Sequence, residues 1–290
     1  MYDQRKQKLI NEKICRIVCA SDDNYAMPLT VMLKSLEMHT NLPVEIYVLD
    51  GGISHSSKYK IERSLSNKIN YIDCKNVSFD FKHKEYMSIT TYYRLLIPSI
   101  MEDYCEKVLY LDCDMIVLND IYSLWKIELD LKAAGAVPEM DKDAHYVSSK
   151  NGLPSYKMLN IPDDVLYFNA GVLLMNLRKW RKEHIADRIL KYLKDYEKYV
   201  LWHDQDGLNA ILWNDCLQID YRWNVMNRFF ETANISESIL GPEVISEIEK
   251  EPYIIHFNQL PKPWEEECRH PYKKEFYKYY RMTQWGKIGG

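Results

Sequence analysis

The sequence contains no long hydrophobic run and no strong excess of either charge. No apolar stretch approaches the roughly 20 residues that a membrane-spanning helix needs, and the polar N-terminus has no signal-peptide core. We therefore expect a cytoplasmic protein without a membrane span. The formal net charge of −4 at pH 7 argues against a general nucleic-acid binder, so no nucleic-acid partner is expected.

Two further absences concern cysteine and glycine. None of the seven cysteines forms a Cys-x-x-Cys pair and their number is odd, which favours reduced thiols in a cytoplasm-like compartment. The sequence also has no Gly-x-Gly-x-x-Gly motif and no Walker loop, and the first predicted strand-to-helix turn contains no glycine. A nucleotide bound at that turn would therefore have to be held by side chains.

The first turn offers suitable side chains in Asp22, Asn24 and Tyr25. A carboxylate accepts a hydrogen bond from a base N–H, an amide bonds a ribose hydroxyl, and an aromatic ring stacks on a base. The same residues also fit the N-terminal cap of a helix, which is the simpler alternative. Both interpretations stay open from this segment alone.

The order of elements in the first half predicts an α/β protein. With 290 residues, of which 47% are hydrophobic, the chain can bury a sizeable core. The hydrophobic patterns predict strands at residues 14–20, 44–49, 69–73 and 108–111, and helices at 28–38 and 90–101, with a polar helix ending near 65. This alternating order is typical of a parallel sheet flanked by helices.

The second half is less regular. Its patterns predict a long apolar strand at 168–177, an amphipathic helix at 182–199, a short helix at 204–212 and a late strand at 253–257. The polar, turn-rich region at 140–166 is a candidate lid. We expect one catalytic domain at residues 1–265, followed by a small basic and aromatic segment at 266–290.

The most informative stretch is Asp112-Cys113-Asp114, which closes the apolar run at 108–111. The pattern indicates a buried strand that delivers two carboxylates at its carboxyl end, where sheets of this kind bind their ligands. Two carboxylates this close repel each other unless a cation lies between them. A lone Asp-x-Asp is more often an ordinary turn, so the interpretation depends on the other motifs.

A histidine and a lysine provide a second motif. His256 lies at the end of an apolar strand, and Lys262 follows six residues later. A lone histidine in a strand is more often a core residue than a ligand. Together with the two aspartates, however, an imidazole and a nearby ammonium would make a site for a metal-bound diphosphate.

The third motif is His203-Asp204-Gln205-Asp206, at the start of the predicted helix 204–212. Helix capping and the helix dipole explain any one of these acidic residues. They do not explain the whole set of motifs.

Taken together, the chain resembles the family-8 glycosyltransferases, which include glycogenin and the bacterial lipooligosaccharide α-galactosyltransferases. The resemblance covers about residues 14–264. It is carried by six segments in order: 20–26 (Ala-Ser-Asp-Asp-Asn-Tyr-Ala), 88–95 (Ser-Ile-Thr-Thr-Tyr-Tyr-Arg-Leu), 108–114, 168–172 (Phe-Asn-Ala-Gly-Val), 204–206, and His256 with Lys262-Pro263-Trp264.

The resemblance implies a fold and an activity. The fold would be GT-A, a Rossmann-like and mostly parallel central sheet flanked by helices, with a small C-terminal helical appendage. The activity would be retaining transfer of galactose or glucose from UDP-galactose or UDP-glucose to a saccharide or glycolipid acceptor, in cell-surface glycan or lipopolysaccharide synthesis. A front-face route is favoured over a double displacement, because the residue that matches the nucleophile position is an amide, Gln205.

The resemblance also assigns residues to roles. Mn²⁺, or Mg²⁺ in its place, would be bound by Asp112, Asp114 and His256. The remaining assignments are uridine contacts at Ala20, Asp22, Asn24 and Tyr25, a diphosphate contact at Lys262, and donor-sugar contacts at Arg94, Asn169, Asp204 and Gln205. The chain departs from the family at Gln259, where a glycine is common three residues after the histidine.

The C-terminal segment at 269–290 has its own composition. Six Lys or Arg residues stand against one Glu, and aromatic residues alternate with the charges. A basic aromatic helix can lie on an anionic membrane surface, which would place the protein on the inner membrane face. The alternative is a closing helix that packs its aromatic rings on the body of the protein.

Two other function classes stay open. A phosphatase of the haloacid-dehalogenase type also has an apolar strand and Asp-x-Asp, but it needs Thr or Val where this chain has Ile116, and it places the motif early in the chain. A non-catalytic nucleotide-sugar-binding protein is the third class. The intact set of Asp112, Asp114, His256 and Lys262 argues against it.

Overall fold

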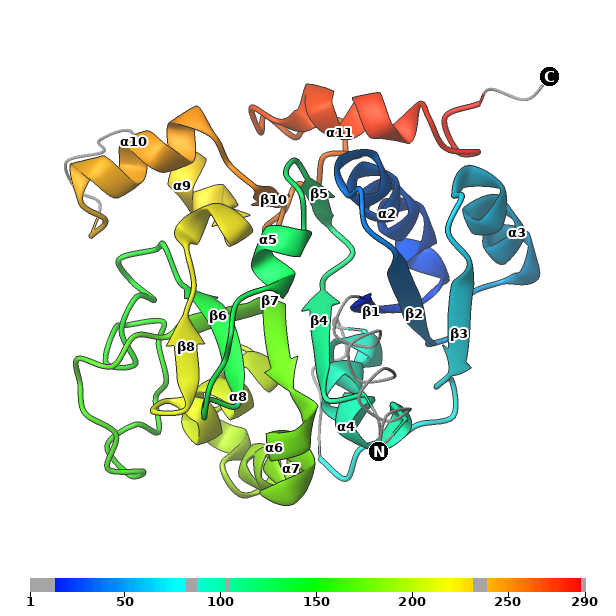
Figure 1. Ribbon diagram of the computed structural model, residues 1–290. Coiled ribbons are helices and arrows are strands. Elements are labelled where there is room, and N and C mark those ends of the chain that lie inside the picture. Colours follow the sequence, from blue (N-terminus) through cyan, green and yellow to red (C-terminus); the bar gives the residue numbers. More distant parts are fainter. Residues whose placement is uncertain (1–13, 82–87, 103–104, 232–238, 288–290) are drawn as a thin grey trace, which may run out of the picture.

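The computed structural model describes residues 14–81, 88–102, 105–231 and 239–287, which form two β-sheets with helices packed around them (Figure 1). The large sheet has seven strands in the order β3-β2-β1-β4-β7-β6-β8. Their bounds are β1 Cys15–Ser21, β2 Val44–Asp50, β3 Ile69–Asp73, β4 Lys107–Leu111, β6 Ala134–Pro138, β7 Phe168–Asn176 and β8 Cys216–Gln218. The small sheet comprises β5 (Met115–Val117), β10 (Ile254–His256) and β9 (Val225–Met226).

The large sheet is mostly parallel, which confirms the predicted fold class. Strands β1 to β4 run in one direction in this sheet, and β6 pairs in parallel with β8. Strand β7 is the exception, because it runs antiparallel to both of its neighbours, β4 and β6. The amino end of β7 therefore lies at the same edge of the sheet as the carboxyl ends of β4 and β6.

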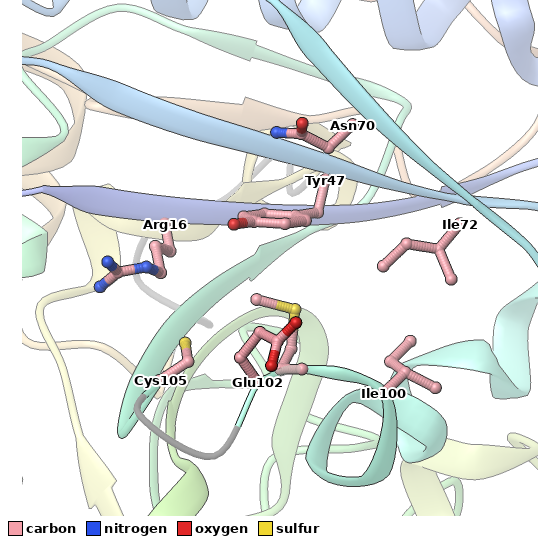
Figure 2. Close-up of a pocket in the computed structure, with 8 residues that line it drawn as sticks. Arg16, Tyr47, Asn70, Ile72, Ile100, Glu102 and Cys105 are labelled. Carbon is pink, nitrogen blue, oxygen red and sulfur yellow. The ribbon is translucent and has the colours of Figure 1, made fainter.

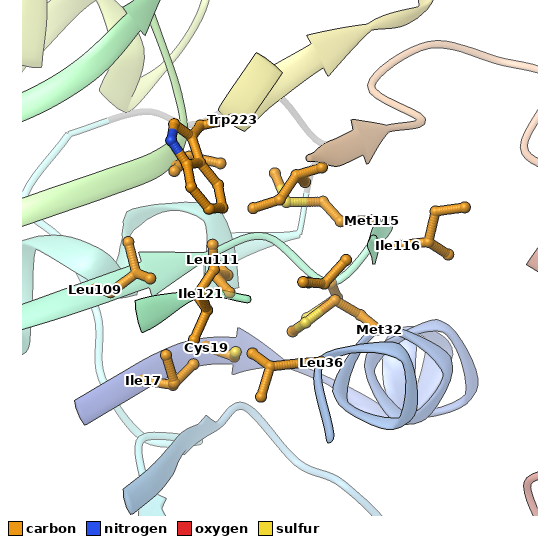
Figure 3. Close-up of a cluster of buried hydrophobic side chains, with 14 of the residues drawn as sticks. Ile17, Cys19, Met32, Leu36, Leu109, Leu111, Met115, Ile116, Ile121 and Trp223 are labelled. Carbon is orange, nitrogen blue, oxygen red and sulfur yellow. The ribbon is translucent and has the colours of Figure 1, made fainter. Parts of the chain in front are cut away.

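Both faces of the sheet are buried, and the side chains of a strand alternate between them. Ile17 and Cys19 of β1 belong to the apolar cluster in Figure 3, which includes Met32 and Leu36 of helix α2. Val18 of β1 belongs to a second cluster on the opposite face. Burial on both faces explains why these strands consist of nearly continuous apolar runs.

The longer helices cover these two faces. Helix α2 (Ala26–His39) packs in the first cluster, and helices α7 (Ile185–Asp195) and α8 (Asp204–Leu212) pack in the second. The other helices are η1 Asp23–Tyr25, α3 His55–Ser64, η2 Ile89–Leu96, α4 Ile97–Ile100, α5 Tyr122–Trp125, α6 Leu177–Lys182, η3 Glu197–Tyr199, η4 Tyr221–Asn224, α9 Asn227–Glu231, α10 Pro242–Lys250 and α11 Lys273–Tyr280.

Two predicted helices differ from the observed ones. Residues 90–101 form a 3₁₀ helix, η2, followed by the short α4, and Pro98 lies in the first turn of α4, where a missing N–H costs nothing. The predicted helix 182–199 is divided into α6, α7 and η3. His184 adopts a left-handed backbone conformation with φ of 51° between α6 and α7, which ends one helix and starts the next. Neither break is visible in the apolar spacing.

The C-terminal helix α11 packs on the body of the protein. Phe276 and Tyr279 are buried in the same cluster as helix α2, and Tyr272 and Trp285 pack at its margin. The aromatic side chains thus lie where the packing alternative placed them, whereas membrane contact stays a prediction. No helix in the described part of the chain combines the length and apolarity needed to cross a membrane.

Candidate active site and metal centre

Two carboxylates lie at the junction of the two sheets. Strand β4 ends at Leu111, Asp112 and Asp114 follow, and β5 starts at Met115. The Asp112 N–H donates to the carbonyl oxygen of Gly171 in β7 at 2.9 Å, and the Phe257 N–H donates to that of Asp114 at 2.9 Å. The backbone of both aspartates is therefore held by neighbouring strands.

Strand β10 brings His256 to these carboxylates. It pairs antiparallel with β5, and His256 lies opposite Met115, the residue after Asp114. The His256 Nε2 atom is 3.4 Å from Asp114 Oδ1 and 3.8 Å from Asp112 Oδ2. One ligand atom from each of the three residues lies within 4.8 Å of the other two. The structure thus brings together the three predicted metal ligands.

A glycine makes room for this cluster. A Cβ atom added to Gly171 would lie 2.4 Å from His256 Cε1 and 2.9 Å from Asp112 Oδ2. No larger residue fits at this position unless the imidazole moves. The glycine in the predicted segment 168–172 is therefore explained by the close approach of the β7 backbone to the site.

The other ring nitrogen of His256 is also engaged. Its Nδ1 atom lies 2.9 Å from Asn224 Oδ1, and both residues are buried. An amide oxygen only accepts, so Nδ1 carries a proton, and in the neutral imidazole the lone pair of Nε2 is directed at the two carboxylates. This is the usual arrangement of a metal-binding histidine, in which the second nitrogen donates to a fixed partner.

Lys262 contacts the carboxylate oxygen of Asp114 that does not face His256. Its Nζ atom donates to Asp114 Oδ2 at 2.6 Å and to the Phe257 carbonyl oxygen at 2.6 Å. Burial by itself would raise the pKa of Asp114, but the Lys262 ammonium opposes burial, and that pKa lies below its usual range. Asp114 is therefore a carboxylate at neutral pH.

Arg94 links two carboxylates from different segments. Its guanidinium is 3.0 Å from Asp112 Oδ1 and 2.8 Å from Asp204 Oδ2, lies over the Tyr110 ring, and donates to the Ala170 carbonyl oxygen. Burial raises the pKa of Asp204 to about 6, and the nearby Asp112 charge adds to this while Arg94 opposes it. The two residues predicted to face a sugar thus form a buried ion pair.

The other two predicted sugar contacts, Asn169 and Gln205, meet at Glu139. The Nδ2 group of Asn169 donates to Glu139 Oε1 at 2.9 Å, and the Nε2 group of Gln205 donates to the same oxygen at 3.3 Å. The Oε1 atom of Gln205 accepts from the Ala170 N–H at 3.0 Å. Burial raises the pKa of the Glu139 carboxyl.

The first strand-to-helix turn closes the site on another side. Asp22 Oδ1 accepts from the N–H groups of Asn24 and Tyr25 at 3.0 and 3.3 Å, so the predicted capping interaction is present. The rings of Tyr25 and Trp264 meet edge to face at 5.9 Å, which brings the first predicted motif to the last. Ala20 lies beside the aspartates, since its carbonyl oxygen accepts from the Cys113 thiol at 3.1 Å.

Sequence reasoning missed two buried residues at the site, Glu139 and Asn224. Glu139 follows directly after the apolar strand β6, so the rule that located Asp112 could also have indicated Glu139. Asn224 ends the short helix η4, and no pattern around it indicates a role.

A separate cavity of about 260 Å³ is lined by side chains of strands β1, β2 and β3 and by residues at and just after the end of helix α4 (Figure 2). The buried Arg16 at its wall pairs with Glu45 at 2.9 Å. None of the predicted site residues lines it; the lining includes Arg16, Tyr47, Asn70, Ile72, Ile100 and Glu102.

Comparison with protein families identifies the chain. The family described as glycosyl transferase family 8 matches residues 16–268, which is most of the chain. The chain belongs to glycosyl transferase family 8. This membership removes the support for a phosphatase, the alternative that the Asp-x-Asp motif left open.

One relative and one solved structure similar to this chain have nearly the same length. General stress protein A of Bacillus subtilis is 29% identical over 287 residues, covering 96% of this chain and 97% of that protein. The galactosyltransferase LgtC, solved with donor and acceptor sugar analogues, is 28% identical with a TM-score of 0.77, covering 93% of this chain and 96% of LgtC. The fold is therefore GT-A, as the resemblance implied.

Other similar proteins are less identical to this chain or longer. The lipopolysaccharide 1,3-galactosyltransferase of Salmonella typhimurium is 25% identical over 216 residues, covering 74% of this chain and 60% of that enzyme. The chain spans only 31% of the glycosyltransferase GlyD of Streptococcus pneumoniae, at 29% identity over 289 residues that cover 94% of this chain.

Proposed function

We propose that this family-8 glycosyltransferase is a metal-dependent hexosyltransferase. It would move galactose or glucose from a UDP-sugar to a saccharide acceptor, with retention of the anomeric configuration. The observation that carries the proposal is the position of His256 Nε2, 3.4 Å and 3.8 Å from two carboxylates with a lysine beside them, while Nδ1 is held by Asn224. The solved structure of LgtC with donor and acceptor analogues supports the same class of reaction.

The donor atoms at this cluster fit Mn²⁺ or Mg²⁺. The set comprises two carboxylate oxygens and one imidazole nitrogen, and an Nε2 lone pair that faces two negative oxygens is repelled unless a cation lies between them. Asp112, Asp114 and His256 would hold the ion. A bound ion would neutralise charge on the diphosphate of the departing UDP.

The remaining charges suit a diphosphate and a sugar. Lys262 is the cation nearest to Asp114 and would contact the phosphate oxygens. The edge-to-face pair of Tyr25 and Trp264 lies in the two motifs assigned to uridine and diphosphate. Arg94 fixes Asp112 and Asp204 relative to each other, so that the metal ligand and the sugar contact keep one geometry.

The residues near the sugar favour a front-face route. A double displacement needs a free carboxylate beside the anomeric carbon. Gln205 is an amide, and the Asp204 carboxylate is buried against Arg94. In the proposed route the bond from the anomeric carbon to the UDP oxygen breaks first. The acceptor hydroxyl then bonds to the same face of the sugar, and its proton passes to a phosphate oxygen of UDP.

A donor panel tests the proposal. Purified protein is incubated with UDP-galactose, UDP-glucose and other UDP-sugars, in Mn²⁺, in Mg²⁺ and in EDTA, and released UDP is measured. We expect release from one of the two named donors, only with metal, and its loss in Asp112→Asn. Asp187→Asn is the matched control, because Asp187 is an exposed carboxylate on helix α7. Metal-dependent UDP binding without release from any sugar would indicate a non-catalytic binder instead.

The stereochemistry is tested on the product. NMR of the transferred hexose should show an α-linkage from an α-linked donor. A β-linked product would contradict retention. A covalent sugar adduct on Asp204 or Gln205, detected by mass spectrometry, would leave retention intact but exclude the front-face route.

A further inference from the structure

Behind the candidate metal site lies an unbroken chain of buried hydrogen bonds. It runs from His256 through Asn224 and Asn169 to Glu139, and all four side chains are at most 9% exposed. The three links are His256 Nδ1 to Asn224 Oδ1, Asn224 Nδ2 to Asn169 Oδ1, and Asn169 Nδ2 to Glu139 Oε1, each of 2.9 Å.

The direction of every link is fixed by one backbone group. The N–H of Gly171 can only donate, and it donates to Asn169 Oδ1 at 2.9 Å. The atom of Asn224 that faces this oxygen must then be the NH₂ group, which turns the Asn224 oxygen towards His256. That oxygen accepts only, so the His256 proton is on Nδ1. Peptide geometry at Gly171 thereby determines the tautomer of a side chain on another strand.

At its other end, this chain of hydrogen bonds reaches Gln205, which is proposed to act at the sugar. Glu139 Oε1 accepts from both Asn169 and Gln205, at 2.9 and 3.3 Å. The side-chain Oε1 of Gln205 accepts from the N–H of Ala170, which precedes Gly171 in strand β7. The imidazole and the Gln205 amide are thus tied to one short piece of β7.

We propose that Asn224 and Glu139 are positioning residues of this enzyme. Asn224 holds the His256 ring so that the Nε2 lone pair points at the metal site. Glu139 holds the Gln205 side chain in a fixed position relative to that ring. The inference rests on the proposed function for its metal and sugar roles. Its statement about the His256 tautomer does not depend on any activity.

The first experiment reads the tautomer directly. Protein with ¹⁵N-labelled histidine is studied by NMR without metal at alkaline pH, and the His256 signals are assigned by their loss in His256→Gln. We expect a protonated Nδ1 and a bare Nε2. The signals should shift towards the other tautomer, or a mixture, in Asn224→Ala, and return in Asn224→Asp, which again offers an acceptor. A bare Nδ1 in the wild-type protein would overturn the proposal.

The second experiment separates the two residues by Mn²⁺ binding, measured by electron paramagnetic resonance of free Mn²⁺. Asn224→Ala should weaken Mn²⁺ binding by about 10- to 100-fold, as is usual when the partner of a metal-binding histidine is lost. Asn224→Asp should recover most of this loss. Equal Mn²⁺ affinity in wild type and Asn224→Ala would overturn the proposal. Absence of Mn²⁺ binding in the wild type would instead refute the proposed metal dependence. The NMR test of the His256 tautomer uses metal-free protein and is independent of that result.

Glu139→Ala tests the other end of this hydrogen-bond chain, because it removes the oxygen that accepts from Asn169 and Gln205. Gly171 still fixes Asn169 in this variant, so the His256 tautomer and Mn²⁺ affinity should be retained, whereas kcat for transfer should fall more than the donor KM changes. Glu139→Gln again offers an acceptor oxygen and should recover most of the lost kcat. Asp50→Ala is the matched control, because Asp50 is a buried carboxylate held by Lys58 and backbone N–H groups outside the site. An unchanged kcat in folded Glu139→Ala would exclude the positioning role of Glu139.

Discussion

The site has a charged side and an amide side, and they are built differently. On the charged side, Asp112, Asp114 and Asp204 face Arg94 and Lys262, three carboxylates against two cations. On the amide side, Asn169 and Gln205 donate to the single carboxylate of Glu139, and Asn224 donates to Asn169. Loss of one partner from a buried ion pair leaves an uncompensated charge, which costs more than the loss of a neutral hydrogen bond. The charged side should therefore dominate the effects of substitution.

The largest effect is expected for Asp114→Asn. Loss of one ligand charge should lower transfer at least about 100-fold, since a metal supplies several kcal/mol of charge stabilisation and each ~1.4 kcal/mol is a factor of ten. The rate is measured by UDP release, and folding is checked by circular dichroism. Near-normal turnover by a folded Asp114→Asn protein would remove the metal assignment, and Asp187→Asn should behave as wild type.

A smaller effect is expected for Lys262→Ala, on the same side. Charge on UDP grows in the transition state, so kcat should fall about 10- to 100-fold while the donor KM changes less. Steady-state kinetics over a range of donor concentrations separate the two. Lys278→Ala, on the exposed face of α11, is the control. A change confined to the KM for the donor would show that Lys262 only binds the ground state.

Gln205→Ala tests the amide side and should slow transfer by about tenfold, because the side-chain amide and its two hydrogen bonds, each worth about 1 kcal/mol, are lost near the reacting centre. The variant removes an acceptor from Ala170 N–H and a donor to Glu139. The same UDP-release assay applies. A loss as large as that of Asp114→Asn would contradict the comparison between the two sides, because it would make Gln205 as important as a metal ligand.

The smallest effect on transfer is expected at His270, which lies on neither side. Burial lowers its pKa to about 4, and its ring packs against Phe257 and Phe230. Because the unfolded pKa is near 6.5, neutral His270 contributes stability above about pH 6.5 that is lost as the pH falls through about 4. His270→Gln should flatten this part of the pH dependence of the free energy of unfolding.

Urea denaturation at several pH values measures that dependence. The wild-type free energy of unfolding should fall by about 2–3 kcal/mol from this group across the range, which is less than the full pKa difference would give because the ring is partly exposed to solvent. His184→Gln is the control, since His184 is exposed beside Asp187. An identical pH dependence in wild type and His270→Gln would show that His270 does not titrate as proposed.

Much of the charged side follows from the sequence, and little of the amide side does. Strand alternation and the apolar run before Asp112 locate the two aspartates, because a strand ends where its apolar pattern ends. His256 is found in the same way at the end of β10. These predictions need only local patterns.

The remaining features depend on pairing between distant segments. No local pattern indicates that β7 runs antiparallel to β4, yet this reversal sets Gly171 against Asp112. Asn224 lies in a short 3₁₀ helix and acquires its role only through contact with His256. The resemblance assigns Arg94 to a sugar contact, and no local pattern indicates that its guanidinium lies between two carboxylates. Sequence spacing contains no information about such contacts.

The backbone bonds of the two aspartates have a consequence for local opening. Asp112 is tied by its N–H to β7, and Asp114 by its carbonyl oxygen to Phe257, so both are continuous with the central ladders. Backbone amides in such ladders open only with large parts of the core. In hydrogen–deuterium exchange, the amides of Asp112 and Phe257 should therefore belong to the slowest-exchanging class. The most protected region of this protein would extend into its candidate active site.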